Sequence, residues 1–131
     1  LQNYLTALDT LVKCDFAQYG ISGETYRKMV KAATGVNFSE EELLKLGERV
    51  WNMIRMFNIR EGISRKDDRL PKRFTEDPLP GGAYQGVVVN EADMQKMLDE
   101  YYALRGWDNN GHPKSEKLEE LGLIKQKKYL F

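Results

Sequence analysis

Two side chains near the amino end of the sequence have the types and spacing that suit cofactor chemistry. Cys14 is the only cysteine among the 131 residues, and Asp9 precedes it by five positions. A cysteine thiolate can bind the iron of an iron–sulfur cluster, but four thiolates usually complete such a cluster. With one cysteine and one histidine, His112, the chain cannot assemble a metal site from its own thiol and imidazole groups. If Cys14 binds a metal, the other ligands come from elsewhere.

Both residues also have an ordinary structural interpretation. A lone cysteine such as Cys14 is more often a small buried apolar side chain than a ligand. An aspartate on a helix, such as Asp9, is more often a solvated polar residue. Composition therefore leaves the two interpretations open.

The charges of the chain are balanced, with twenty basic and twenty acidic residues. Binding to a phosphate backbone relies on net or clustered positive charge, so no nucleic-acid partner is expected. Asp67 and Asp68 invite a metal or acid–base role, but they lie among the basic residues Arg65, Lys66 and Arg69. This mixture of signs favours ion pairs that hold the loop in place.

The sequence also bears on location. No apolar run approaches the roughly 20 residues that a membrane-spanning helix needs, and no signal-peptide pattern follows Leu1. We therefore expect a cytoplasmic protein without a membrane partner. Because the first residue is not methionine and the first dozen residues already read as helix, we also expect a chain that lies within a longer gene product.

Apolar residues recur at three- and four-residue spacing along much of the chain, which predicts α-helices. We expect helices over residues 3–13, 23–34 and 40–58, one from Asn90 to Arg105, and one from Ser115 to Leu121. In the third of these, Trp51 and Phe57 mark an apolar side, so this helix is expected at the centre of the core.

Residues 59–89 contain three prolines and four glycines, which break helices and favour turns. We expect a long irregular loop here, with at most a short strand at residues 87–89. The sequence thus predicts an all-α fold, an irregular bundle of about five helices with a long Pro/Gly-rich loop. It would form one helical domain over residues 1–131. The basic tail at residues 125–128 is expected to be exposed.

Two longer segments resemble a known protein family. Residues 46–62 read LGERVWNMIRMFNIREG, and residues 64–73 read SRKDDRLPKR. Together with residues 98–107 and 118–123, they resemble the C-terminal region of the tungsten-dependent aldehyde:ferredoxin oxidoreductase family, in the same order. The resemblance covers most of the chain and implies the C-terminal helical domain of a larger oxidoreductase.

The resemblance implies specific roles for Asp9 and Cys14. The family binds a tungsten (or molybdenum) bis-pterin cofactor and a [4Fe–4S] cluster, and three cluster cysteines lie upstream. The last domain supplies the fourth from a motif D-x-x-G-x-C that also contacts the pterin. Cys14 would accordingly be the cluster ligand, and the Asp9 carboxylate would accept hydrogen bonds from pterin N–H groups. Val12 stands where the motif has the glycine that lets a backbone approach a cofactor closely.

The resemblance also implies a function for the parent protein. It would oxidise aldehydes to carboxylic acids and pass electrons through the pterin and the cluster to ferredoxin. The chain would have the upstream domains of its own polypeptide as partners. Side chains that act on substrate lie upstream in this family, so this chain alone is expected to contain no catalytic residue, to be inactive and to bind neither cofactor.

A second hypothesis comes from a different functional class. The chain would be a stand-alone helical module that binds a protein partner without a cofactor. An exposed Cys14 next to Asp9 on a partly apolar surface would favour the cofactor hypothesis, whereas a Cys14 buried in the core would favour the module. A domain that packs on a larger protein should also expose apolar side chains at the contact.

Overall fold

The fold is built from helices alone in the part of the chain that the structure describes. The computed structural model describes residues 1–125, apart from the side chain of Asp15, so the expected basic tail lies outside it beyond Lys125. Six α-helices and two short 3-10 helices occur in this range, without a strand at residues 87–89 or elsewhere in it. The all-α prediction is confirmed. In chain order the elements are α1 (Gln2–Asp9), η1 (Asp15–Tyr19), α2 (Gly23–Thr34), α3 (Glu40–Arg60), η2 (Arg65–Asp67), α4 (Lys72–Glu76), α5 (Glu91–Arg105) and α6 (Ser115–Glu120).

Side-chain caps determine where the longer helices begin. The Ser22 hydroxyl accepts a hydrogen bond from the Thr25 amide at the start of α2. Ser39 and Glu42 form a reciprocal capping box at the start of α3. These side chains satisfy amide groups that have no partner within the first turn of a helix.

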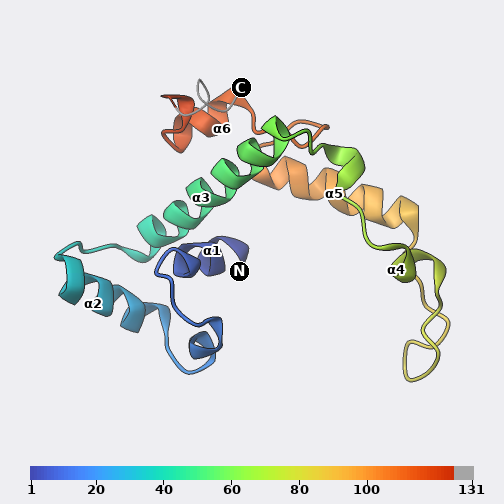
Figure 1. Cartoon of the computed structure of the whole chain (residues 1–131), viewed down its shortest axis with the longest axis horizontal. Coiled ribbons are helices and arrows are strands. Elements are labelled where there is room, and N and C mark those ends of the chain that lie inside the picture. The colour runs from blue at the N-terminus through green and yellow to red at the C-terminus, as the bar shows by residue number, and fades with distance from the viewer. Residues whose placement is uncertain (126–131) are drawn as a thin grey trace.

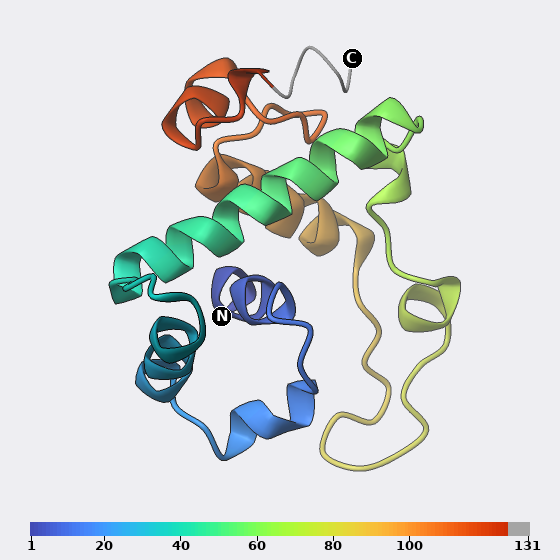
Figure 2. The same cartoon turned by 60° about the vertical axis from the view of Figure 1, so that its left-hand side comes forward.

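The long helix α3 is the axis around which the other elements are arranged. In both views α1, η1 and α2 lie on one side of α3, whereas α6 lies on the other (Figures 1 and 2). The loop between α4 and α5 projects away from the helices as a separate arm. The connector from α1 to η1, which carries Cys14, lies between α2 and this arm.

Two buried clusters lie along α3. One joins α3 to the C-terminal segment through Met56, and the other joins the region of Trp51 to α5. Phe57 was expected in the core but is 47% exposed. The remaining members of the first cluster are Leu118, Leu121 and Leu123, and those of the second are Leu98, Tyr102, Trp107, Met94 and Tyr101.

Candidate cofactor-binding site

The segment from Asp9 to Cys14 is a tight turn that follows α1. The helix was predicted to reach Lys13 but ends at Asp9. The amide of Leu11 donates to the carbonyl of Leu8, and the amide of Val12 donates to the carbonyl of Asp9, each at 3.0 Å. These i to i−3 hydrogen bonds tighten the chain and end the α-helix.

Val12 closes this turn in a left-handed conformation, with φ of 53°. It is the only non-glycine residue with positive φ among the described residues. A β-branched residue rarely adopts this conformation because its Cβ crowds the following carbonyl, whereas glycine adopts it freely. The backbone at Val12 thus has a conformation that a glycine would favour.

Cys14 and Asp9 are both exposed at the two ends of this turn. Cys14 has an extended backbone, with φ of −66° and ψ of 127°, and precedes the first residue of η1. Within residues 1–125, no three histidine, cysteine, aspartate or glutamate side chains are grouped so that they could hold a metal ion. The chain therefore presents one accessible thiol that can complete a site whose other ligands lie elsewhere.

Large apolar side chains surround Cys14 in the sequence and are also exposed. Val12 is 95% exposed, Phe16 82% and Tyr19 84%. Apolar groups of this size are usually buried, and several of them together mark a surface that another molecule or domain covers.

Close packing against α3 holds α1 in place. A Cβ atom added at Gly47 would lie 1.7 Å from the carbonyl oxygen of Asn3 and 3.0 Å from the amide nitrogen of Ala7. The backbone of α1 thus lies directly against Gly47, where no side chain has room. Ala7 and Leu8 are fully buried at this contact and exclude water from it.

Side chains from α5 hold the first turn of α1. Arg105 donates hydrogen bonds to the side-chain oxygens of Gln2 and Asn3. The Tyr101 hydroxyl donates to Gln2 Oε1 at 2.9 Å and accepts from Trp51 Nε1 at 2.9 Å. The start of α1 is therefore tied to α5 and α3 together.

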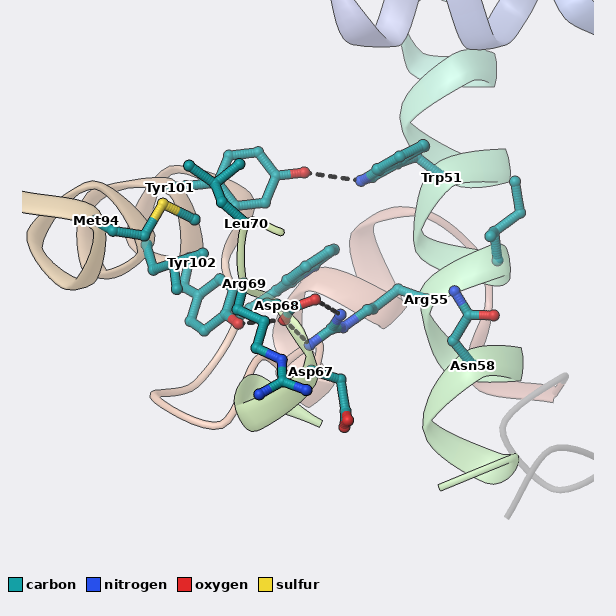
Figure 3. Close-up of a pocket in the computed structure, with 13 residues that line it drawn as sticks. Trp51, Arg55, Asn58, Asp67, Asp68, Arg69, Leu70, Met94, Tyr101 and Tyr102 are labelled. Atoms are coloured by element: carbon teal, nitrogen blue, oxygen red, sulfur yellow. Dashed lines mark hydrogen bonds and ion pairs between the residues drawn. The ribbon is translucent and has the colours of Figure 1, made fainter. Parts of the chain in front are cut away.

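A second polar network lies at the far end of α3. The Arg55 guanidinium pairs with both carboxylate oxygens of Asp68, at 2.8 and 2.6 Å, and its Nε donates to the carbonyl of Gly111 at 2.8 Å. The Tyr102 hydroxyl donates to the same Asp68 carboxylate, and the Arg55 guanidinium lies 5.0 Å from the centre of the Trp107 ring. Figure 3 shows Arg55 and Tyr102 converging on Asp68 from two helices.

The pKa values of this network follow from its contacts. Burial alone would raise the pKa of Asp68, but hydrogen bonds from Arg55 and Tyr102 and the charge of Arg55 lower it below its ordinary value. Burial and the hydrogen bond to Asp68 raise the pKa of Tyr102 to about 12. Asp68 is thus held as a carboxylate and Tyr102 as a neutral phenol, an arrangement suited to structure rather than to proton transfer.

The ion pairs predicted around Asp67 and Asp68 involve other partners than those expected. Asp68 pairs with Arg55 from α3 rather than with its sequence neighbours. Asp67 accepts the Ser64 amide hydrogen bond at 2.9 Å and caps η2. Arg65 instead reaches α5, where it contacts Asp99 at 2.6 Å.

A pocket of about 430 Å³ lies beside this network, between α3, residues 67–70 and α5. Trp51, Tyr101 and Trp107 supply aromatic walls, and the Arg55–Asp68 pair supplies a polar one. Sequence reasoning singled out none of Arg55, Tyr102 and Arg105. Their only signal was that each falls within a segment that resembles the family.

Comparison with known proteins identifies the family. The model for the family described as "Aldehyde ferredoxin oxidoreductase, domains 2 & 3" matches residues 1–123. This chain belongs to the aldehyde ferredoxin oxidoreductase family. The match covers α1 to α6, including the Asp9–Cys14 turn and both polar networks of α3.

Individual members of the aldehyde ferredoxin oxidoreductase family are also similar. The tungsten-containing aldehyde ferredoxin oxidoreductase of Thermococcus kodakarensis is 44% identical over 123 residues, and that of Pyrococcus furiosus is 46% identical over 121 residues. These matches cover 93% and 91% of this chain but 20% of each relative. The chain thus spans about a fifth of the length of these family members.

The fold is shared with the solved structure of a reductase complex. The active site complex BamBC of benzoyl coenzyme A reductase, in complex with 1,5 dienoyl-CoA, superposes with a TM-score of 0.63 and 31% identity. The superposition covers 79% of this chain and 14% of that chain.

Among the described residues, no helix is both long and apolar enough to cross a membrane.

Proposed function

We propose that this chain is the C-terminal domain of a tungsten-dependent oxidoreductase and completes its cofactor site. In this proposal Cys14 is one ligand of a [4Fe–4S] cluster, and Asp9 contacts the pterin of a tungsten bis-pterin cofactor. The parent protein would oxidise aldehydes and pass the electrons to ferredoxin in the cytoplasm. The chain alone would be inactive, because none of its residues would touch the substrate.

The turn from Asp9 to Cys14 is the observation that carries this proposal. Val12 adopts a left-handed conformation at the position where the family motif has glycine. A valine accepts the cost of this conformation, about 1–2 kcal/mol, only where the surrounding structure enforces it. The turn has a backbone conformation that glycine adopts freely, and it exposes Cys14 and Asp9 at its ends.

The residues of this chain fit the part of the cofactor site that one domain would supply. One exposed thiol matches a domain that contributes a single cluster ligand, since the described residues contain no further group of metal ligands. The Asp9 carboxylate can accept hydrogen bonds, as a pterin N–H group requires. When bound, the tungsten would supply the two-electron oxidation of the substrate and the cluster would transfer electrons one at a time.

The exposed apolar side chains near Cys14 support upstream domains of the same polypeptide as the partner. Phe16 and Tyr19 are each more than four-fifths exposed. A domain that carries the other cluster ligands would approach Cys14 and cover these side chains. This contact would also exclude water from the cofactor, which strengthens every electrostatic interaction around it.

The test uses the full-length protein, purified without oxygen, with iron, acid-labile sulfide and tungsten measured per polypeptide. We expect Cys14→Ala to lose cluster iron and sulfide, and Asp9→Asn to lose tungsten while it retains the cluster. Glu41→Gln is the matched control, because it neutralises an exposed carboxylate in the first turn of α3, outside the Asp9–Cys14 turn. If the full-length protein contains no iron, or keeps its cluster after Cys14→Ala, the chain is better described as a cofactor-free interaction module.

A further inference from the structure

We propose that Arg105 is a positioning residue that acts through α1 to place Cys14 and Asp9 against the cofactors. This inference rests on the proposed function and adds residues that do not touch either cofactor. It concerns how α5, distant in sequence, controls the turn that follows α1.

Arg105 is a buried residue that is hydrogen-bonded to α1. Arg105 is 9% exposed. Two of its guanidinium nitrogens donate hydrogen bonds to Gln2 Oε1 and Asn3 Oδ1 in the first turn of α1. The guanidinium also lies 5.4 Å from the centre of the Tyr101 ring. Tyr101 in turn shares Gln2 Oε1 as an acceptor, at 2.9 Å. The planar guanidinium presents several donors in a fixed geometry, so it fixes the orientation of α1 as well as its position.

A backbone contact supplies the second point of attachment. The carbonyl of Asn3 and the amide of Ala7 lie against Gly47 of α3. This contact sets how close α1 lies to α3. The hydrogen bonds of Arg105 to the first turn add resistance to rotation of α1 about its own axis. Together the two contacts hold a rigid helix of eight residues, about 12 Å long.

A movement of α1 should be passed on to Cys14 through the short turn that joins them. The chain leaves α1 through the hydrogen bonds from Leu11 to Leu8 and from Val12 to Asp9, so the connection has little slack. The potential of an iron–sulfur cluster depends on hydrogen bonds to its sulfurs and on its exposure to solvent. A ligand supplied by one domain to a cluster held by another should therefore be sensitive to its placement.

Arg65 provides a matched comparison within the same chain. It is also a partly buried arginine with several hydrogen bonds, to Gln95, Asp99 and the carbonyl of Asn109. It lies 5.3 Å from the Tyr102 ring, as Arg105 lies close to Tyr101. Its contacts join η2 and residue 109 to α5 and do not include α1. Loss of Arg65 should cost stability without moving Cys14.

The experiment compares Arg105→Ala, Arg105→Lys and Arg65→Ala in the full-length protein loaded with its cofactors. The readouts are the electron paramagnetic resonance spectrum of the reduced cluster, its midpoint potential and the thermal unfolding midpoint. We expect Arg105→Ala to shift both the spectrum and the potential, and Arg105→Lys to restore them in part, because a lysine ammonium keeps the charge but lacks the fixed two-nitrogen geometry of the guanidinium. Arg65→Ala should lower the unfolding midpoint but leave the spectrum and the potential unchanged.

Two outcomes would overturn the inference. One is a cluster spectrum and potential that Arg105→Ala leaves unchanged, and the other is an equal change in Arg105→Ala and Arg65→Ala. The proposed function is tested separately by Cys14→Ala, which removes the ligand itself. If Cys14→Ala destroys the cluster but Arg105→Ala has no effect on it, the proposed function stands and the positioning role of Arg105 is wrong.

Discussion

The Arg55 guanidinium and the Asp68 carboxylate form a two-point ion pair, at 2.8 and 2.6 Å, that joins the C-terminal half of α3 to the residue after η2. The Arg55 side chain is 8% exposed and that of Asp68 is 24% exposed. The pair holds the irregular segment against α3. Asp68 also accepts a hydrogen bond from the Tyr102 hydroxyl of α5. One carboxylate thus joins three parts of the chain that are far apart in sequence.

Removal of the Asp68 charge should destabilise the chain. We expect Asp68→Asn to lower the free energy of unfolding by about 2–3 kcal/mol, because the buried Arg55 guanidinium loses its charged partner. Urea unfolding followed by tryptophan fluorescence measures this change. Asp77→Asn, at an exposed position, is the control and should change stability by less than about 0.5 kcal/mol. Equal effects of the two variants would contradict the role of the ion pair.

The same pair should make stability depend on acid pH. The pKa of Asp68 is lower in the folded protein than in the unfolded chain, so the unfolded chain binds a proton first as the pH falls. The contribution is fully present above the unfolded value, near pH 3.9, and is lost as the pH falls through the folded pKa. We expect the unfolding free energy of the wild-type chain to fall more steeply than that of Asp68→Asn below about pH 4. Parallel curves in urea titrations across this range would refute the prediction.

The contact at Gly47 should not tolerate a side chain. We expect Gly47→Ala to lower the unfolding free energy by about 3 kcal/mol, because the added Cβ meets backbone atoms of Asn3 that cannot rotate away. The better helix propensity of alanine offsets at most about 1 kcal/mol of this. Gly20→Ala is the control, since nothing lies within 4 Å of the added Cβ and its φ is −116°. A Gly47→Ala variant as stable as Gly20→Ala would mean that α1 does not lie against α3 in this way.

Replacement of the strained residue Val12 by glycine should stabilise the chain. We expect Val12→Gly to raise the unfolding free energy by about 1 kcal/mol, since glycine relieves the left-handed strain at some cost in chain entropy. Val36→Gly is the control, because Val36 is also exposed but does not have a positive φ. It should lower stability by about 1 kcal/mol, because glycine adds chain entropy and removes a half-buried side chain. Thermal unfolding of both variants checks this, and stabilisation by both would exclude relief of strain as the cause.

Much of the helical structure could be predicted from local sequence. The caps Ser22, Ser39 and Asn90 stand at the predicted starts of α2, α3 and α5, because capping depends on side chains within one turn of the helix end. Gly35 ends α2 in a left-handed conformation for the same local reason.

Other features depended on contacts between distant residues. The apolar period of residues 3–13 continues past Asp9, so it gave no sign that Val12 would turn the chain in a left-handed conformation. Phe57 follows the apolar pattern of α3 yet is 47% exposed, because periodicity places a residue on a face without telling what covers that face.

The candidate site also has features that the local sequence determined and features that contacts between distant residues decided. The sequence by itself determined which chemistry the chain can offer: one thiol at Cys14, one carboxylate five residues earlier, and a family resemblance that joins them. Only the tertiary structure decided that Asp68 pairs with Arg55 rather than with neighbouring cations, and that Arg105 and Gly47 hold the helix before Cys14. The physical reason is that these interactions act over different distances along the chain. Residue types and caps act within a few positions of the chain, whereas burial and ion pairing depend on which distant segments the fold brings together.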